Sequence, residues 1–222
     1  MHKEFWRHIG DNHGYKSILC TNGDIPNANF FKHNHLLPII AIDGAANKLV
    51  EHDIIPSYVV GDLDSVDLNT LSSTKVVYTP EQDKSDLEKA MEFLSTQNLL
   101  PTITVGFSGG YIDHILHNMN ILLRSDSVLY SDSTVCYSLR ENSTKKFILP
   151  MGSKISLIGI PSAKVRTEGL KWNLDSSTPL TFPGVSSAFN RTIEKEISIT
   201  VNEGVALVVI YLFHIQDMGL TC

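Results

Sequence analysis

The sequence predicts an α/β protein: a Rossmann-like N-terminal domain with a parallel sheet, followed by an antiparallel β-sandwich domain. Two observations predict this class. In the first part of the chain, short apolar runs alternate with helical patterns, as in parallel sheets covered by helices. After about Ser131 no helical period persists, and short apolar runs are separated by Gly, Pro, Ser and Asn. We therefore expect domains at residues 1–132 and 133–222.

The elements of the first domain are predicted from apolar runs and helical periods. Helices are expected over 45–52, 85–97 and 112–124. In the second of these, apolar residues recur at i, i+3, i+4 and i+7, and Ser85 with Glu88 forms a capping box. In the third, one apolar face is expected, made of Ile115, Leu116, Met119, Leu122 and Leu123. Strands are expected over 17–20, 36–42, 58–61, 75–78, 102–105 and 127–130.

The second domain is predicted to consist of short strands only. They are expected over 135–139, 146–149, 155–160, 196–201 and 206–212. Trp172 has two interpretations: a core residue of the sandwich, or an exposed indole at a turn that stacks on a flat or cationic ring. Residues 186–190 are interpreted as a polar loop.

Composition and charge exclude several classes of protein. Of 222 residues, 42% are hydrophobic and 19% are charged, as in globular proteins with a full core. The net charge of −6 argues against a protein that coats nucleic acid, which needs a basic face. Cys20, Cys136 and Cys222 lack metal-ligand spacing, which predicts reduced thiols and a cytoplasmic location. Residues 1–15 show no signal peptide, and no apolar run could span a membrane.

Acidic and Gly-rich turns follow the strands of the predicted parallel sheet. Ligands of such sheets bind outside the carboxyl ends of the strands. For each acidic residue alone, a cap or turn role is at least as plausible as a ligand role. Five of them on one edge exceed what caps require; they are Asp43, Asp62, Asp64, Asp86 and Asp113.

Asp62 and Asp64 directly follow a strand and are separated by one residue. If the chain stays extended, the two side chains face the same way, with Cα atoms about 7 Å apart. Two carboxylates about 4 Å apart repel by roughly 4 kcal/mol at an effective dielectric constant near 20. A divalent cation removes that cost, and magnesium is commonly held by one or two carboxylates with phosphate oxygens. The pair therefore suggests a magnesium site, with a simple turn as the alternative.

Two further patterns lie close to the start of the third helix. Residues 108–110, Ser-Gly-Gly, could cradle a phosphate through backbone N–H groups, although the lysine of a Walker A loop is absent. His114 and His117 are three apart on the helix. We favour capping or surface roles for them over a role as a pair of metal ligands.

Five blocks in this order resemble the thiamin pyrophosphokinase family. They are residues 43–47 (Asp-Gly-Ala-Ala-Asn), 61–65 (Gly-Asp-Leu-Asp-Ser), 82–89 (from Gln-Asp-Lys-Ser-Asp), 109–114 (Gly-Gly-Tyr-Ile-Asp-His) and 169–174 (Gly-Leu-Lys-Trp-Asn-Leu). The resemblance covers most of the chain and implies a nucleotide-binding α/β domain followed by a β-sandwich. It also implies transfer of pyrophosphate from ATP to thiamin, giving thiamin diphosphate and AMP. Mg²⁺ and a homodimer with an active site shared between subunits are implied as well.

Residue roles follow from the resemblance by position. It implies that the catalytic residues are Asp62, Asp64, Asp86 and Asp113, of which the first three hold the metal. It implies that ATP contacts Asn22, Asp43, Gln82, Ser85, Lys89, Ser108, Gly109 and Gly110. Thiamin would contact Trp172 of the partner subunit, with Ser187 and Asn190 near its pyrimidine ring.

Three departures from the family pattern affect these roles. Tyr111 occupies a position where the family commonly has Arg, Ala45 replaces a Gly, and the Ser-Asn motif is stretched over 187–190. Two alternatives remain beside the resemblance. One is a haloacid-dehalogenase-like phosphatase with Asp62 as nucleophile. The other is a thiamin- or nucleotide-binding protein without catalysis.

Overall fold

The computed structural model describes residues 14–67, 69, 71 and 73–212. The chain divides into two compact units, residues 1–132 and 133–222. Cys222 and nearly all of the N-terminal segment searched for a signal peptide lie outside the described residues. In the part of the chain that is described, no helix has the length and apolar character needed to cross a membrane. The thiols of Cys20 and Cys136 are buried and free.

The first unit is built on a parallel sheet of six strands. The strands are β1 (Ser17–Cys20), β2 (Ile39–Ile42), β3 (Tyr58–Gly61), β4 (Lys75–Tyr78), β5 (Thr102–Val105) and β6 (Ser127–Tyr130). Their order in the sheet is β6-β5-β1-β2-β3-β4. The chain therefore runs from β1 outward to β4 and then returns to β5, on the other side of β1. The junction between β1 and β5 is the topological switch point, where ligands of such sheets bind.

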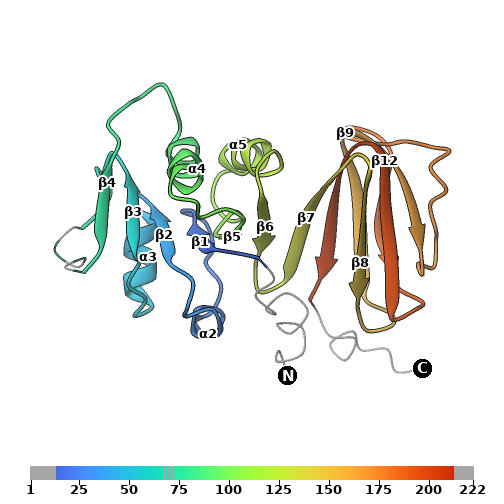
Figure 1. Cartoon of the computed structure of the whole chain (residues 1–222), viewed down its shortest axis with the longest axis horizontal. Coiled ribbons are helices and arrows are strands. Elements are labelled where there is room, and N and C mark those ends of the chain that lie inside the picture. Colours follow the sequence, from blue (N-terminus) through green and yellow to red (C-terminus); the bar gives the residue numbers. More distant parts are fainter. Residues whose placement is uncertain (1–13, 68, 70, 72, 213–222) are drawn as a thin grey trace. The chain divides into compact units, whose positions relative to one another are not determined.

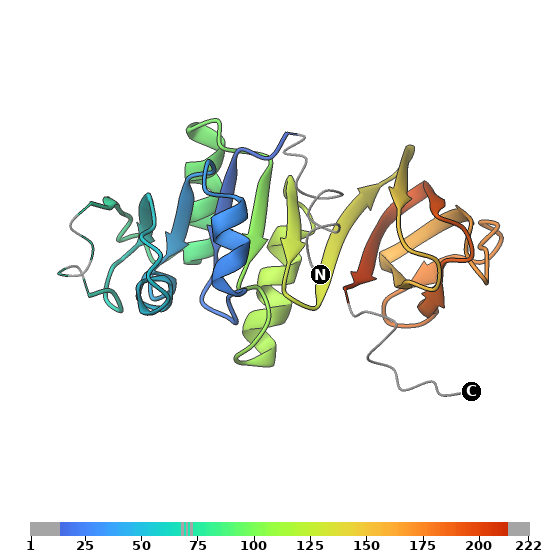
Figure 2. The same cartoon turned by 90° about the horizontal axis from the view of Figure 1, so that it is seen from below.

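Helices cover both faces of this sheet. They are α2 (Ala28–His33), α3 (Ala45–Glu51), α4 (Asp86–Thr96) and α5 (Ile112–Leu122). Figures 1 and 2 show α2 and α3 on one face and α4 and α5 on the other. Right-handed crossovers require this arrangement, because the chain moves across the sheet in opposite directions before and after β4. The Rossmann-like fold class predicted for this part of the chain is confirmed.

The two long helices differ in how well their predicted apolar faces are buried. In α4, Leu87, Ala90 and Leu94 are buried, and the predicted capping box of Ser85 and Glu88 is present. In α5, burial is confined to its last turn and C-cap, at Ile121, Leu122 and Leu123. Leu116, expected on the buried face, is 55% exposed. The helical period was predicted correctly, but the sheet is covered only by the C-terminal part of this helix.

All strand pairs among the described residues of the second unit are antiparallel. Its strands are β7 (Thr134–Arg140), β8 (Ser143–Ile148), β9 (Lys154–Glu168), β10 (Leu180–Thr181), β11 (Ser186–Arg191) and β12 (Glu196–Tyr211). The first half of β12 pairs with β8 and its second half pairs with β7, while β9 pairs with β12, β10 and β11. Inward-facing residues such as Ile155, Leu157 and Ile199 are fully buried. The predicted sandwich class is confirmed.

Several elements differ from the sequence prediction. The runs predicted as strands 196–201 and 206–212 form the single strand β12, because irregularities near Glu203 and Gly204 bend the strand without ending its pairing with β9. Residues 186–190 are not a loop: they belong to β11, an edge strand that pairs with β9. Helix α2 was not predicted; it begins after Asn27, whose side chain accepts a hydrogen bond from Asn29 N at 3.0 Å.

Candidate active site

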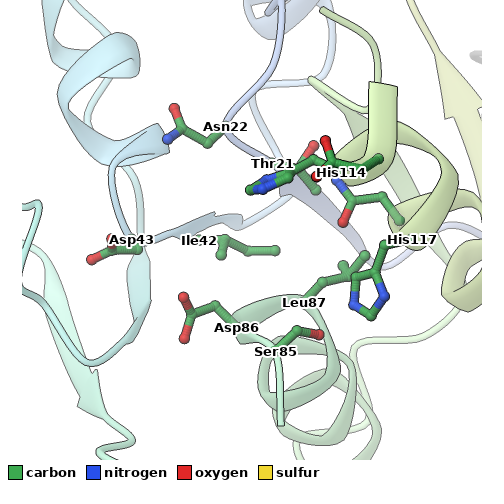
Figure 3. A pocket seen from close by; sticks show the side chains of 11 residues that line it. Thr21, Asn22, Ile42, Asp43, Ser85, Asp86, Leu87, His114 and His117 are labelled. Carbon is green, nitrogen blue, oxygen red and sulfur yellow. The ribbon is translucent and has the colours of Figure 1, made fainter. Parts of the chain in front are cut away.

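A pocket of about 550 Å³ lies at the carboxyl edge of the parallel sheet. Its walls come from the loops after β1 and β2, the start of α4 and the first half of α5. Figure 3 shows the carboxylates of Asp43 and Asp86 on one side of the pocket, with His117 beside Leu87 on the other. The lining residues are Thr21, Asn22, Ile42, Asp43, Ser85, Asp86, Leu87, Asp113, His114, His117 and Asn118.

Three carboxylates converge at the acidic side of this pocket. One oxygen each from Asp43, Asp62 and Asp86 lie within 4.8 Å of one another, and all three residues are partly buried. They come from the ends of β2 and β3 and from the first residue of α4, which the sheet topology brings to one edge. At such separations each like-charge pair costs on the order of 4 kcal/mol at an effective dielectric constant near 20. The cluster is therefore costly without a cation.

Asp43 is the strained member of this cluster. Its φ of 40° lies in the left-handed region, and its backbone N–H donates to Val60 O of β3 at 3.1 Å. A Cβ on Gly61 would lie 3.1 Å from Cβ of Asp43, so glycine there leaves room for the side chain. Oδ1 of Asp43 is buried without a hydrogen-bond partner among the described residues, as is the hydroxyl of Thr79, which follows β4.

Burial raises the pKa of Asp43 above its ordinary value. The Ser65 hydroxyl and the Gly44 backbone N–H lower this pKa, and the charges of Asp64 and Asp86 raise it further. A buried oxygen without a hydrogen-bond partner, next to two other carboxylates, is suited to bind a hard divalent cation, because such cations prefer oxygen ligands. Asp43, Asp62 and Asp86 are therefore the residues that could hold a metal.

Neighbouring groups hold the other two carboxylates in place. Asp62 accepts hydrogen bonds from Gln82 Nε2 at 3.2 Å and from the backbone N–H of Asp64 at 3.4 Å. Asp86 accepts from the ammonium of Lys89, one turn along α4, at 3.0 Å. Gln82 and Lys89 were predicted as ATP contacts. The structure places them beside the carboxylates, and neither lines the pocket.

The predicted geometry of Asp62 and Asp64 is wrong. It assumed an extended chain, but β3 ends at Gly61 and Leu63 adopts a left-handed φ of 66°. The regular alternation of side chains therefore stops before Asp64. Asp43 takes its place in the cluster, and the Asp64 carboxylate accepts a hydrogen bond from Ser65 Oγ at 2.7 Å. Asp64 still lies close enough to raise the pKa of Asp43.

The loops after β1 and β5 pack backbone against backbone at the switch point. Gly23 N donates to Gly106 O at 2.8 Å, and Asp24 N donates to Ser108 O. A Cβ on Gly23 would lie 2.0 Å from Ser108 O, and one on Gly106 would lie 2.1 Å from Thr21 O. No side chain larger than hydrogen fits at either position. Lys48 of α3 also donates to the carbonyls of Asn22 and Gly23, at 2.7 and 3.0 Å.

The Ser108-Gly109-Gly110 turn, predicted to cradle phosphate, does not line the pocket. The carboxylate of Asp24 lies against it: a Cβ on Gly109 would be 2.5 Å from that group. Among the other predicted ATP and catalytic residues, Asn22, Asp43, Ser85, Asp86 and Asp113 do line the pocket. The hydroxyl of Ser85 is engaged with Glu88 in the capping box of α4.

The pocket wall formed by α5 was not predicted. His114, His117 and Asn118 of α5 line it, together with the apolar side chains of Ile42 and Leu87. The i, i+3 spacing of the histidines was the available signal, but the rotation of α5 toward the pocket is set by tertiary packing. Asn47 was also missed as a positioning residue: its side chain donates to Ser65 O at 2.7 Å and accepts from Asp67 N at 3.1 Å.

The predicted thiamin-binding residues gather in the second unit around Asn190. Its side chain accepts from the backbone N–H of Trp172 at 3.2 Å and donates to the Trp172 carbonyl at 2.7 Å. It also donates to Ser187 Oγ at 3.2 Å, and the residue is 1% exposed. Trp172 itself is 56% exposed, so the core interpretation is wrong, and its stacking on a ligand ring stays a prediction.

Two family models match consecutive parts of this chain. The first, described as "Thiamin pyrophosphokinase, catalytic domain", matches residues 30–135. The second, described as "Thiamin pyrophosphokinase, vitamin B1 binding domain", matches residues 138–206. The chain belongs to the thiamin pyrophosphokinase family. The family resemblance drawn from the five sequence blocks is thereby confirmed.

Curated relatives and solved structures carry the same family name. Thiamine pyrophosphokinase 1 of Arabidopsis thaliana is 27% identical over 218 residues, covering 82% of this chain and 81% of the relative. Thiamine pyrophosphokinase 3 of Oryza sativa subsp. japonica is 30% identical over 166 residues, covering 66% and 62%. Thiamine pyrophosphokinase from Bacillus subtilis matches with a TM-score of 0.74 at 20% identity, covering 88% of this chain and 99% of that chain. The enzyme from Candida albicans matches with a TM-score of 0.75 at 14% identity, covering 88% and 89%; these structures show a shared fold.

Neither alternative from the sequence is favoured by these matches to the thiamin pyrophosphokinase family. The hypothesis of a binding protein without catalysis has no support from the names of the relatives.

Proposed function

We propose that this protein transfers the pyrophosphoryl group of ATP to the hydroxyl of thiamin, with Mg²⁺ as the metal. The activity is that of a thiamin pyrophosphokinase, and its products are thiamin diphosphate and AMP. The observation that supports the proposed site is the convergence of Asp43, Asp62 and Asp86 within 4.8 Å at the edge of a pocket.

ATP is assigned to the pocket of the first unit. The polar groups that line it beside the acidic cluster are Thr21, Asn22, Ser85, Asp113, His114, His117 and Asn118. A bound Mg²⁺ would neutralise the phosphate oxygens and join them to carboxylates that would otherwise repel them. Asp43, Asp62 and Asp86 would hold this cation, with Asp64 close by.

The chain's own contribution to the reaction is positioning. The thiamin hydroxyl oxygen bonds to the β-phosphorus of ATP, the bond to the α,β-bridging oxygen breaks, AMP leaves with that oxygen, and the hydroxyl proton is released. Gln82 and Lys89 fix the carboxylates before substrate arrives, so little reorganisation is needed during the transfer. No aspartate becomes phosphorylated in this scheme.

Thiamin is assigned to the second unit. The exposed indole of Trp172 offers a face for the cationic thiazolium. The Trp172 carbonyl and the Ser187 hydroxyl both accept hydrogen bonds from the Asn190 side chain. Because Asn190 is buried and its side chain is engaged, we assign it a positioning role. We further propose a homodimer in the cytoplasm, in which Trp172 of one subunit serves the pocket of the other.

The assay is incubation of the protein with ATP, Mg²⁺ and thiamin, followed by chromatography of nucleotides and thiamin esters. AMP and thiamin diphosphate should form in equal amounts, and EDTA should abolish both. Release of ADP or phosphate without thiamin would contradict the proposal.

Asp86→Asn should lower kcat at least about 100-fold, because the metal site loses a charge. The matched control is Asp53→Asn. Asp53 lies between α3 and β3, at the end of β3 opposite to Asp62, and its φ of 59° suits asparagine. That variant should keep wild-type kcat, and equal losses in both variants would remove Asp86 from the metal site.

A further inference from the structure

Phe189 is an exposed aromatic residue in an unusual position on β11. Its side chain is 57% exposed, although the strand around it pairs with β9. The pairing shifts register between Ser187 and Asn190, so Ala188 and Phe189 form a bulge. The exposed ring therefore belongs to the stretch of β11 that carries one extra residue relative to β9.

The backbone of Phe189 is held in a conformation that bulky residues avoid. Its φ is 53°, in the left-handed region, which glycine and asparagine adopt far more readily than phenylalanine. Its N–H donates to Ser156 Oγ at 2.9 Å, and Ser156 is buried in β9. A strained residue anchored from the core, with its ring directed outward, is typical of ligand contacts.

The bulge is connected directly to the proposed thiamin site. The residue after Phe189 is Asn190, whose side chain binds both backbone groups of Trp172 and the hydroxyl of Ser187. Lys171 N also donates to Arg191 O at 2.8 Å. Two exposed aromatic side chains, Trp172 and Phe189, are thus positioned by neighbouring parts of one hydrogen-bonded segment.

The ring of Phe189 already interacts with a cation. Nζ of Lys154 lies 5.6 Å from its ring centroid, and the ring of Tyr211 lies 5.4 Å away, on β12, which pairs with β9. Lys154 is the residue paired with Arg191 across β9 and β11, so the ammonium is carried by the same part of the sheet. A face that accepts an ammonium can also accept another organic cation.

We infer that Phe189 is a specificity-determining residue, which presents a second aromatic face, beside Trp172, to the cationic ring system of thiamin. This inference rests on the proposed function. The bulge positions the ring, Ser156 fixes its backbone, and Tyr211 supports it from β12. An incoming thiazolium takes the place of the Lys154 ammonium at the ring face.

The test is Phe189→Asn in the full-length protein, with steady-state kinetics for both substrates and thermal unfolding. Asparagine suits the left-handed backbone, so the fold should be retained and the midpoint of unfolding should not fall. The thiamin KM should rise about tenfold while the ATP KM stays within about twofold, since a stacked cation–ring contact is lost. Phe189→Tyr, which keeps the ring, should restore the thiamin KM.

The matched control is Ile148→Asn. Ile148 lies on β8 and is also 57% exposed, but it has no link to the Asn190 network in the described structure. Its thiamin KM should not change. An unchanged thiamin KM in Phe189→Asn, or an equal rise of the ATP KM, would overturn this inference and leave the proposed function standing. A wild-type protein that forms no AMP from ATP and thiamin would overturn both.

Discussion

The ammonium of Lys89 lies 3.0 Å from Oδ1 of Asp86, and only 6% of the Lys89 side chain is exposed. The two residues are three apart on α4, whose first turn is fixed by the capping box of Ser85 and Glu88. A cation so placed offsets part of the repulsion within the acidic cluster. It also holds Asp86 in one orientation before any ligand binds.

Lys89→Met should therefore weaken the site and the fold together. The methionine keeps the apolar stem but leaves Asp86 without its cation, which we expect to cost about 1–3 kcal/mol in the free energy of unfolding. The kcat should fall roughly 10–100-fold, because a displaced carboxylate misplaces the phosphates. Urea unfolding and initial-rate kinetics measure the two effects. Lys84→Met is the control, since Lys84 pairs with Glu92 at the surface and its loss should leave both values nearly unchanged.

Asp43→Asn should stabilise the protein while abolishing activity. Because the pKa of Asp43 is raised in the folded state, its ionised form lowers stability as the pH rises through that raised pKa. Asparagine removes this penalty, so the midpoint of unfolding should rise by about 2 °C at pH 7. Below the ordinary pKa of aspartate, about 3.9, the difference between variant and wild type should disappear.

A Mg²⁺ titration of the same pair supplies the second readout. Mg²⁺ should raise the midpoint of unfolding of the wild type, because only the folded state offers the three carboxylates. The gain should be clearly smaller in Asp43→Asn. A variant that is less stable than wild type at pH 7 would show that the Asp43 charge is compensated in the metal-free protein.

Asn190→Ala tests whether the Asn190 side chain positions Trp172 for thiamin binding. The variant loses the hydrogen bonds to both backbone groups of Trp172, and we expect a loss of about 1–3 kcal/mol in unfolding free energy. The thiamin KM should rise several-fold and the ATP KM should not. Asn202→Ala, which removes only an exposed hydrogen bond to Ser176, should change neither. Equal changes in both KM values would indicate general loosening of the second unit.

Asn47→Ala tests whether the loop after β3 is held from α3. The side chain bridges Ser65 O and Asp67 N, so its loss should let the segment that carries Asp62 and Asp64 move. We expect the Mg²⁺ concentration for half-maximal activity to rise about tenfold, with little change in unfolding free energy. Metal-dependent initial rates measure the shift. An unchanged metal dependence would show that β3 alone positions Asp62.

Much of the fold was predictable because its determinants are local. Helix α4 has both a helical period and a capping box in one stretch of sequence, and its observed bounds differ from the prediction by one residue at each end. The acidic edge was also predictable, because the carboxyl ends of parallel strands meet at one side of a sheet. The long strands β9 and β12 were not, because their bends lie at irregularities that only the pairing partner reveals.

The site was predicted less well where the backbone leaves the extended conformation, because side chains then no longer alternate between the two faces of the strand. The left-handed φ of Leu63 could not be inferred from a residue type that avoids it, so Asp64 was predicted as a metal ligand, while Asp43 was placed at the acidic edge as an ATP contact. The α5 wall depends on how that helix is rotated, which is set by its buried last turn. Residues 186–190 were interpreted as a loop because their polar character hides an edge strand.

The close packing of Gly23 and Gly106 at the switch point limits how this pocket can be altered. A single methyl group at either position would overlap a carbonyl oxygen of the opposite loop, so neither loop can be changed alone. Laboratory selection for other nucleotides should therefore leave these two glycines untouched. Tolerated changes should accumulate on α5, where His114 and His117 are exposed side chains on a solvent-facing half-helix. The backbone contact between the loops after β1 and β5 is therefore fixed, whereas α5 contributes pocket-lining side chains that can change.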